Sequence, residues 1–232
     1  MRVLQPFCRA RLTAADFAFI RTVLLPEMTE QAAFNRLFSD EQMLDVLLDD
    51  PRLYRELLES VEHVEVSLPL YFYVTTRNVL TTSGIDDREV ADYLASLLVT
   101  SAENRLAPGG ARGQRQGFYA VDMMARIQAA PPAQAFALTL SLANQALFYA
   151  GVFPEHIRRR TRRRAAPGLE YYDSVGSAHF RAASGHTLAR EFALESVLGT
   201  LGEGFREARR ALNDFSDRVA FVGHASDTYG QN

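Results

Sequence analysis

A long stretch of this chain carries no charge: no Asp, Glu, Lys or Arg lies between Arg126 and Glu155. A helix over residues 133–151 would have no side fully suited to water, so it would either lie at the centre of a bundle or span a membrane. Polar and proline residues make the apolar stretch short for a membrane span. These residues are Pro131, Pro132, Gln134, Thr139, Ser141, Asn144 and Gln145. We therefore expect a central core helix and no membrane insertion.

Capping signals predict helices along much of the remaining chain. Thr13 with Asp16, and the tetrads 39–42 and 86–89, have the composition of helix N-termini. Residues 70–76 have strand-forming side chains, but Ser67 as a cap and Gly84 as a stop favour a helix there. No second strand is evident for this segment to pair with, so we predict a helix. Further helices are expected near 118–129, 133–151, 154–164, 167–184 and 187–222.

The segment 187–222 has the most regular apolar pattern. Its apolar residues alternate four and three positions apart, which makes about four heptad repeats. They are Leu194, Leu198, Leu201, Phe205, Ala208, Leu212, Phe215, Val219 and Val222. The pattern predicts one long C-terminal helix with a buried seam, either inside a bundle of the same chain or across a homodimer. We favour the first arrangement, because several other helices are available to cover the seam.

The length and composition suit one domain with a sizeable core, since the chain has 232 residues of which 47% are hydrophobic. We predict an all-α, single-domain bundle of about eight or nine helices over residues 1–222. Residues 104–117 are rich in Gly, Pro and Arg and are expected to form a flexible loop, and residues 223–232 a disordered tail. The single Cys8 excludes an internal disulfide and no signal peptide is evident, so we expect a cytoplasmic protein.

Charge is distributed unevenly along the chain. Residues 27–65 hold eleven acidic and three basic residues, whereas Arg158–Arg164 holds six arginines in seven positions. The candidates for anion binding in this tract are Arg159, Arg160, Arg163 and Arg164. On a helix these arginines point all round the axis, and the tract has no aromatic residue for base stacking. We therefore expect them to be solvated and to pair with the acidic N-terminal half, and we do not expect nucleic-acid binding.

Few of the patterns that catalytic and metal sites require are present. All 25 basic residues are arginine, which excludes Schiff-base lysines and P-loop nucleotide binding. The five histidines form no zinc or di-iron motif, so we expect no metal and no cofactor. The best candidate for a ligand pocket is a polar cluster on the 167–184 helix, where Tyr or His could act as an acid or base. Its residues are Tyr171, Tyr172, Asp173 and His179.

Two strings of residues flank the arginine tract. Phe148–His156 contains Gly-x-Phe-Pro-Glu, and Leu169–His179 contains Glu-Tyr-Tyr-x-x-x-Gly. Together they resemble a family of uncharacterised bacterial helical proteins. Glu170 stands where the family pattern has Asp, and His179-Phe180 falls around its final Tyr. No activity is established for this family, so the resemblance implies an all-helical fold and no particular function.

The resemblance draws attention to a few positions that structure alone can explain. They are Gly151, Phe153, Tyr171, Tyr172 and Gly176. We expect Gly151 to end a helix in the left-handed conformation, and Gly176 to let another helix approach closely.

Three functions are compatible with the sequence. The first is a soluble, non-catalytic interaction or scaffolding protein that binds a protein partner or a second copy of itself. The second is a helical enzyme or small-ligand binder with a pocket near Tyr172 and His179. The third is a regulator that binds anions or nucleic acid through Arg158–Arg164. We favour the first, because no sequence pattern contradicts it.

Overall fold

The computed structural model describes residues 3–27, 30–59, 66–106, 120–164 and 166–229, and it confirms the all-α class. This part of the chain holds thirteen α-helices and one short 3-10 helix, more than the eight or nine expected. The first elements are η1 (Arg9–Arg11), α1 (Ala14–Leu24), α2 (Gln31–Ser39), α3 (Glu41–Leu48), α4 (Pro51–Glu59), α5 (Leu68–Thr82) and α6 (Arg88–Leu106). The later ones are α8 (Ala120–Ala129), α9 (Pro132–Val152), α10 (Pro154–Arg164), α11 (Leu169–Ser184), α12 (Thr187–Glu191), α13 (Glu195–Glu203) and α14 (Phe205–Tyr229). The expected loop 104–117 lies outside the described residues except for 104–106, which belong to α6.

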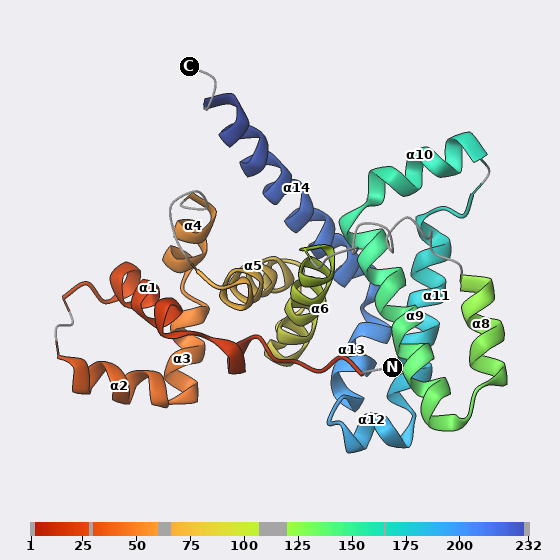
Figure 1. Cartoon of the computed structure of the whole chain (residues 1–232), viewed down its shortest axis with the longest axis horizontal. Helices are drawn as coiled ribbons and strands as arrows, with labels where there is room; N and C mark the ends of the chain where they lie inside the picture. The colour runs from red at the N-terminus through yellow and green to blue at the C-terminus, as the bar shows by residue number, and fades with distance from the viewer. Residues whose placement is uncertain (1–2, 28–29, 60–65, 107–119, 165, 230–232) are drawn as a thin grey trace.

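The helices form two groups that meet at α5 and α6 (Figure 1). Helices α1 to α4 make an arm on one side, and α8 to α13 form the group on the other side. Contacts of α5 with α4, α6 and α14, and of α6 with α9 and α13, join the two groups. One apolar core therefore runs from Leu48 in α3 through Leu80 in α5 and Leu94 in α6 to Leu147 in α9.

Helix α9 lies at the centre of its group, as its lack of charge predicts. It packs against α6, α8, α10, α11 and α14, and Leu142 and Leu147 are fully buried. By length and composition α9 passes the test for a membrane-spanning helix, with a mean hydropathy of 1.3, yet 61% of that window is buried inside the protein. The amide oxygen of Asn144 accepts a hydrogen bond from the Tyr93 hydroxyl at 2.9 Å. Burial by other helices and a satisfied polar side chain identify α9 as a core helix.

Side chains of α14 cap the C-terminal end of α9 by hydrogen bonds to its last carbonyl groups. Asn213 donates through Nδ2 to the carbonyl oxygens of Ala150 and Gly151, and the Ser216 hydroxyl donates to that of Val152 at 3.0 Å. These bonds satisfy carbonyl groups that a helix end leaves without a partner.

The expected left-handed stop at Gly151 is wrong. Gly151 lies within α9, and among the described glycines the positive φ belongs to Gly84, at 87°. A Cβ added at Gly151 would lie 2.7 Å from Cβ of Leu212 in α14. The absence of a side chain at Gly151 therefore serves close packing of α9 on α14.

The prediction of one long C-terminal helix is also wrong, because residues 187–222 are divided among α12, α13 and α14. A left-handed Ala193, with φ of 54°, separates α12 from α13, and Gly204 separates α13 from α14. Glycine destabilises a helix interior by about 1 kcal/mol relative to alanine, and Gly202 and Gly204 stand together at the second break. Of the segment 223–232, expected as a tail, residues 223–229 have helical backbone and end α14.

The apolar seam is buried despite these breaks. Every member from Leu194 to Phe215 is at most 6% exposed in the single chain. The side chains of Val219 and Val222 lie outside the described residues. For its described part, the intramolecular arrangement is therefore confirmed.

Most of the expected helix starts are confirmed, with small shifts in the capping residue. Thr13 and Asp16 form the capping box of α1, and the Ser67 hydroxyl accepts from the Leu70 amide to begin α5. The cap of α3 is Asp40 instead of Ser39. The segment with strand-like composition is therefore the helix α5.

Gly176 allows the close helix contact that the sequence predicts. A Cβ at this position would lie 2.0 Å from Cε2 of Phe205, a side chain that is 2% exposed. The ring of Phe205 in turn packs against that of Phe180, with centroids 6.1 Å apart.

Replacing Gly176 with Ala should therefore lower the free energy of unfolding by about 1–3 kcal/mol, because the Phe205 ring has to move within a packed core. Gly199→Ala is the matched control, since no atom lies within 4 Å of the added Cβ. It should leave stability unchanged or raise it by up to about 1 kcal/mol through helix propensity. Urea unfolding measures both, and a similar response of the two variants would contradict the proposed contact.

Candidate functional site

The four residues of the predicted ligand pocket on α11 do not form one site. Tyr171 and Tyr172 line a cavity together with Arg160 of α10. Asp173 faces α14, where it accepts from Arg209 Nε at 2.6 Å. His179 lies about two turns along α11, and its ring Nδ1 is 2.7 Å from the carbonyl oxygen of Val175. The cavity that Tyr172 lines does not include His179, in contrast to the shared pocket expected from the sequence.

Asp173 belongs to a buried ion pair that fixes α14 on α11. Asp173 and Arg209 are each 8% exposed, and Arg206 approaches the same carboxylate at 3.4 Å. Arg209 also donates through Nη1 to the side-chain oxygen of Asn213, the residue that closes the end of α9. This carboxylate already has two guanidinium partners, which assigns it to the scaffold and not to ligand binding.

The cavity beside Tyr172 is small and lies where α8, α10 and α11 meet. Its volume is about 150 Å³, and its polar walls are Arg160, Tyr171, Tyr172 and Asp122. Burial raises the pKa of Tyr172, and the nearby Arg160 partly opposes this shift. The phenol is therefore neutral near pH 7, and the cavity offers hydrogen bonds, the positive charge of Arg160 and the carboxylate of Asp122.

A second, open groove lies along α10 and the start of α11. Its volume is about 690 Å³, and Tyr171 lines both this groove and the cavity described above. The other lining residues are Arg158, Thr161, Arg162, Gly168, Leu169 and Glu170. Thus the aromatic ring that the arginine tract lacks in sequence comes from α11 in the folded chain.

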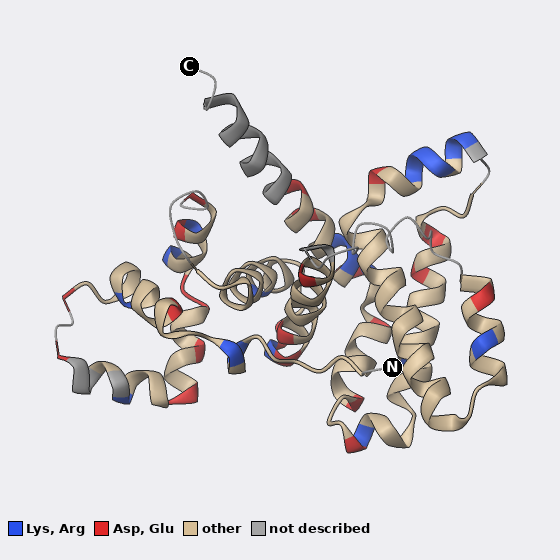
Figure 2. Cartoon of the chain, viewed as in Figure 1, with Lys and Arg blue, Asp and Glu red and all other residues tan. Residues whose placement is uncertain are grey.

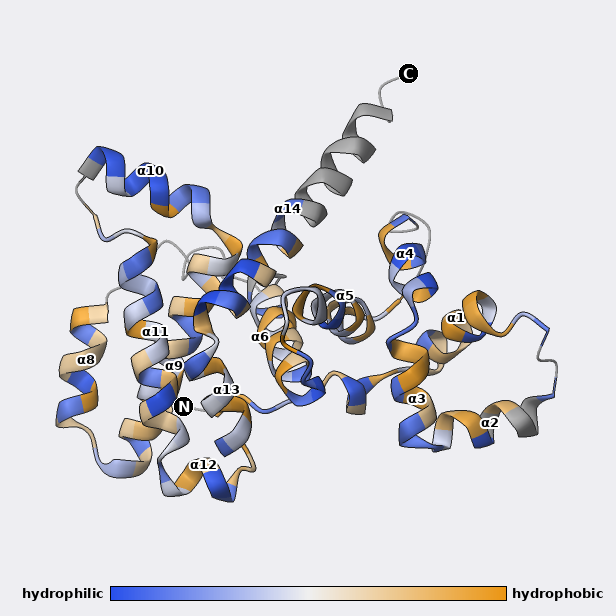
Figure 3. Ribbon diagram, turned by 180° about the vertical axis from the view of Figure 1, so that it is seen from behind, coloured by the Kyte–Doolittle hydropathy of each residue, from blue (hydrophilic) through white to orange (hydrophobic). Residues whose placement is uncertain are grey.

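Helix α10 carries the arginine tract away from the bundle (Figure 2). Arg158, Arg159, Arg162 and Arg163 are exposed, Arg160 is half-buried at the cavity, and the side chain of Arg164 lies outside the described residues. Buried Ile157 anchors the helix, and the Thr161 hydroxyl donates to the carbonyl of Pro167 at 3.2 Å. Most of the α10 ribbon has the colour of hydrophilic residues (Figure 3).

The expected pairing of these arginines with the acidic N-terminal half is wrong. Among the described side chains of the tract, Arg158 forms an ion pair, and its partner is Glu155 on the same helix. The acidic helix α3 lies on the opposite side of the molecule (Figure 2).

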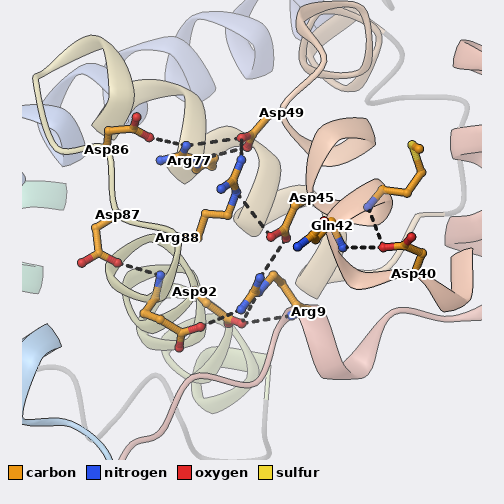
Figure 4. Close-up of polar contacts among 12 residues, drawn as sticks. Arg9, Asp40, Gln42, Asp45, Asp49, Arg77, Asp86, Asp87, Arg88 and Asp92 are labelled. Carbon is orange, nitrogen blue, oxygen red and sulfur yellow. Dashed lines mark hydrogen bonds and ion pairs between the residues drawn. The ribbon is translucent and has the colours of Figure 1, made fainter.

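Asp45 of α3 and Asp49, the C-cap of this helix, pair instead with arginines of α5 and α6 (Figure 4). Asp49 accepts from Arg77 Nε at 3.0 Å and from Arg88 Nη2 at 2.6 Å. Arg77 also bonds to Asp86, and this hydrogen bond holds the pKa of Asp86 below its ordinary value. The contact fixes α3 to the central helices.

Arg9 extends this cluster to the N-terminal strap, residues 3–12. It pairs with Asp45 of α3 at 2.8 Å and with Glu89 of α6 at 2.7 Å. The buried carboxylate of Asp92 accepts from the backbone amides of Phe7 and Cys8, which holds the strap on α6. Because each carboxylate of the cluster already has a donor, we assign the cluster a structural role.

Sequence reasoning missed these residues. The available signals were Asp45 and Asp49, one turn apart on a predicted helix, and Arg77 within an apolar segment. Neither signal identifies the partner, because Arg77 and Asp49 are separated by 28 positions in the chain.

Metal and thiol chemistry have no basis in the described residues. No group of three or more His, Cys, Asp or Glu there has a geometry suited to a metal ion. Cys8 is fully buried, and this burial raises the pKa of its thiol to about 12. At pH 7 the sulfur is therefore a thiol and not a nucleophilic thiolate.

Comparison with protein-family models, with curated proteins and with solved structures finds no match to this chain. The resemblance to a bacterial helical family therefore stays a prediction. Function has to be argued from the site itself.

Asp49→Asn tests the structural role of the cluster. We expect a loss of about 3 kcal/mol in the free energy of unfolding, because two guanidinium groups lose their shared charged partner in a partly buried place. Asp50→Asn is the control, since Asp50 pairs with Arg52, whose side chain is 60% exposed. It should cost less than about 1 kcal/mol. Equal losses in urea unfolding would argue against the role assigned to Asp49.

Cys8, as the single cysteine, reports on the strap without further engineering. Alkylation by iodoacetamide at pH 8 should be at least about 100-fold slower in the native protein than in urea, because the native thiol is both buried and protonated. Mass spectrometry over a time course measures this ratio. Rapid native alkylation would mean that the strap opens readily from α6.

Proposed function

We propose that this protein is a non-catalytic interaction protein of the cytoplasm that binds a polyanionic partner on α10. The observation that carries this proposal is the display of Arg158, Arg159, Arg162 and Arg163 on one exposed helix, with Glu155 as the acidic partner among the described residues. Like charges one turn apart on a helix repel each other. A polyanion removes this repulsion and releases its own counterions, so binding is favourable and depends on salt.

An enzymatic function has less support. Tyr172 and His179, which would have supplied acid and base, lie in different surroundings. The cavity next to α10 combines Arg160 and Asp122 with two phenols, a set that can donate and accept hydrogen bonds to a ligand.

A second copy of the chain is also a weaker candidate for the partner. The described part of the C-terminal seam is already buried within one chain. Asp45 of α3 and Asp49, the residue that follows this helix, are paired with Arg9, Arg77 and Arg88. These two carboxylates are therefore already occupied and are not available to α10 of a second copy.

The test measures binding of inorganic polyphosphate, a polyanion without bases or side chains. Wild-type protein should bind it at low salt, with affinity falling steeply as salt rises. Changing Arg158, Arg159, Arg162 and Arg163 together to Gln should weaken binding by at least about 10-fold. Circular dichroism should show an unchanged fold, because exposed ion pairs contribute only about 0–1 kcal/mol each.

The matched control changes four exposed arginines outside α10, which are Arg36, Arg55, Arg126 and Arg210, to Gln. It removes the same total charge, so binding should stay within about 2-fold of wild type if α10 is the site. Absence of binding by the wild type, or an equal loss in both variants, would contradict the proposed function.

A further inference from the structure

Tyr171 lies beside α10, between the cavity and the groove described above. It is half-buried near the start of α11 and lines both the cavity that contains Arg160 and the groove that contains Arg158 and Arg162. Its ring meets that of Tyr172 edge to face, with centroids 6.1 Å apart and an interplanar angle of 90°. Packing against the small apolar cluster around Val175 also holds Tyr171 in position. An aromatic ring fixed in this way loses little conformational freedom when a ligand stacks on it.

The guanidinium groups lie along one wall of the groove. Arg158 and Arg162 are four positions apart on α10, which places them about 6 Å apart along the helix axis. Thr161 adds a hydroxyl to the same wall, and Glu170 is the carboxylate that lies on the groove. The groove thus combines a line of positive charge with an aromatic side chain.

We propose that this groove binds single-stranded nucleic acid, with a base stacked on Tyr171 and backbone phosphates on Arg158 and Arg162. This inference rests on the proposed function and names the partner that α10 takes. Proteins that bind single strands without sequence preference combine a positively charged groove with aromatic stacking platforms. The folded chain supplies both, although its sequence places them on two different helices.

Other polyanions fit this surface less well. An acidic peptide pairs with arginines but has no use for the ring, and a duplex keeps its bases stacked internally. A membrane-bound amphipathic helix needs an apolar face, and none of the exposed large hydrophobic residues in the described chain lies on α10. The half-buried ring beside the arginines therefore favours a partner with free bases.

The experiment compares probes on the wild-type protein by competition against a fluorescent oligothymidylate of about 12 nucleotides, a length within the range of known single-strand sites. An abasic strand of the same length keeps the phosphates and lacks the bases. It should compete about 10-fold less well than oligothymidylate, because it cannot stack. The further competitors are oligouridylate, a duplex of the same length, polyglutamate, and vesicles with anionic lipid. Comparison of oligouridylate with oligothymidylate distinguishes an RNA partner from a DNA partner.

Variants at Tyr171 test the stacking contact directly. Tyr171→Leu should weaken oligothymidylate binding by about 10-fold and leave polyphosphate binding unchanged, whereas Tyr171→Phe should keep both. Tyr54→Leu, at a half-buried tyrosine of the distant α4, should change neither. If Tyr171→Leu does not fold, the abasic comparison on wild-type protein decides alone.

The outcomes separate the two proposals. Equal binding of the abasic and normal strands, or tighter binding of the duplex, polyglutamate or vesicles, would overturn the nucleic-acid inference and leave polyanion binding in place. Failure of wild-type protein to bind polyphosphate as well as oligonucleotides would overturn the proposed function itself. Preference for single strands that depends on Tyr171 and the bases would support both.

Discussion

The absence of charge from α9 is the constraint on which the rest of the structure depends. Since no side chain of this helix demands water, five other helices can surround it. Such close approach needs small residues, so Gly151 faces Leu212 of α14, and Gly176 of α11 faces Phe205. The cost is that the polar groups of α9 need partners from the protein, which Tyr93, Asn213 and Ser216 supply.

Several charged residues lie at the edges of the core, where they act in pairs. Arg77 and Arg88 bind Asp49 between the arm and the central helices, and Arg209 binds Asp173 between α11 and α14. Each pair joins elements far apart in the chain and is partly shielded from salt by its burial. Among the described residues no ion pair joins an arginine of α10 to another element, and four of these arginines are exposed together on one helix. This clustering is the reason to regard them as a binding surface.

Features set by local sequence could be predicted, and those set by contacts between distant segments could not. The lack of charge from 127 to 154 and the caps at Thr13 and Ser67 act within one helix, and the helices they predict are present. The left-handed backbone at Ala193 could not be predicted from its residue type, since alanine rarely adopts this conformation. Tyr172 and His179 share a helix face by spacing, but two turns separate them by about 10 Å, so different neighbours cover each. Tyr171 came to lie beside the arginines through the packing of α10 on α11, which no local pattern reveals.

The short junction between α9 and α10 has a mechanical consequence. Phe153 alone connects the two helices, and its amide remains bonded to the carbonyl of Tyr149 in the last turn of α9. The direction of α10 is thereby tied to a helix end that α14 clamps from the other side. A ligand that restrains α10 would also restrain this end, and so would slow amide exchange there without touching it. Helix α10 is thus coupled to the core at its N-terminal end. This coupling reduces the conformational entropy that α10 loses when a ligand binds, and it lets the binding event affect the end of α9.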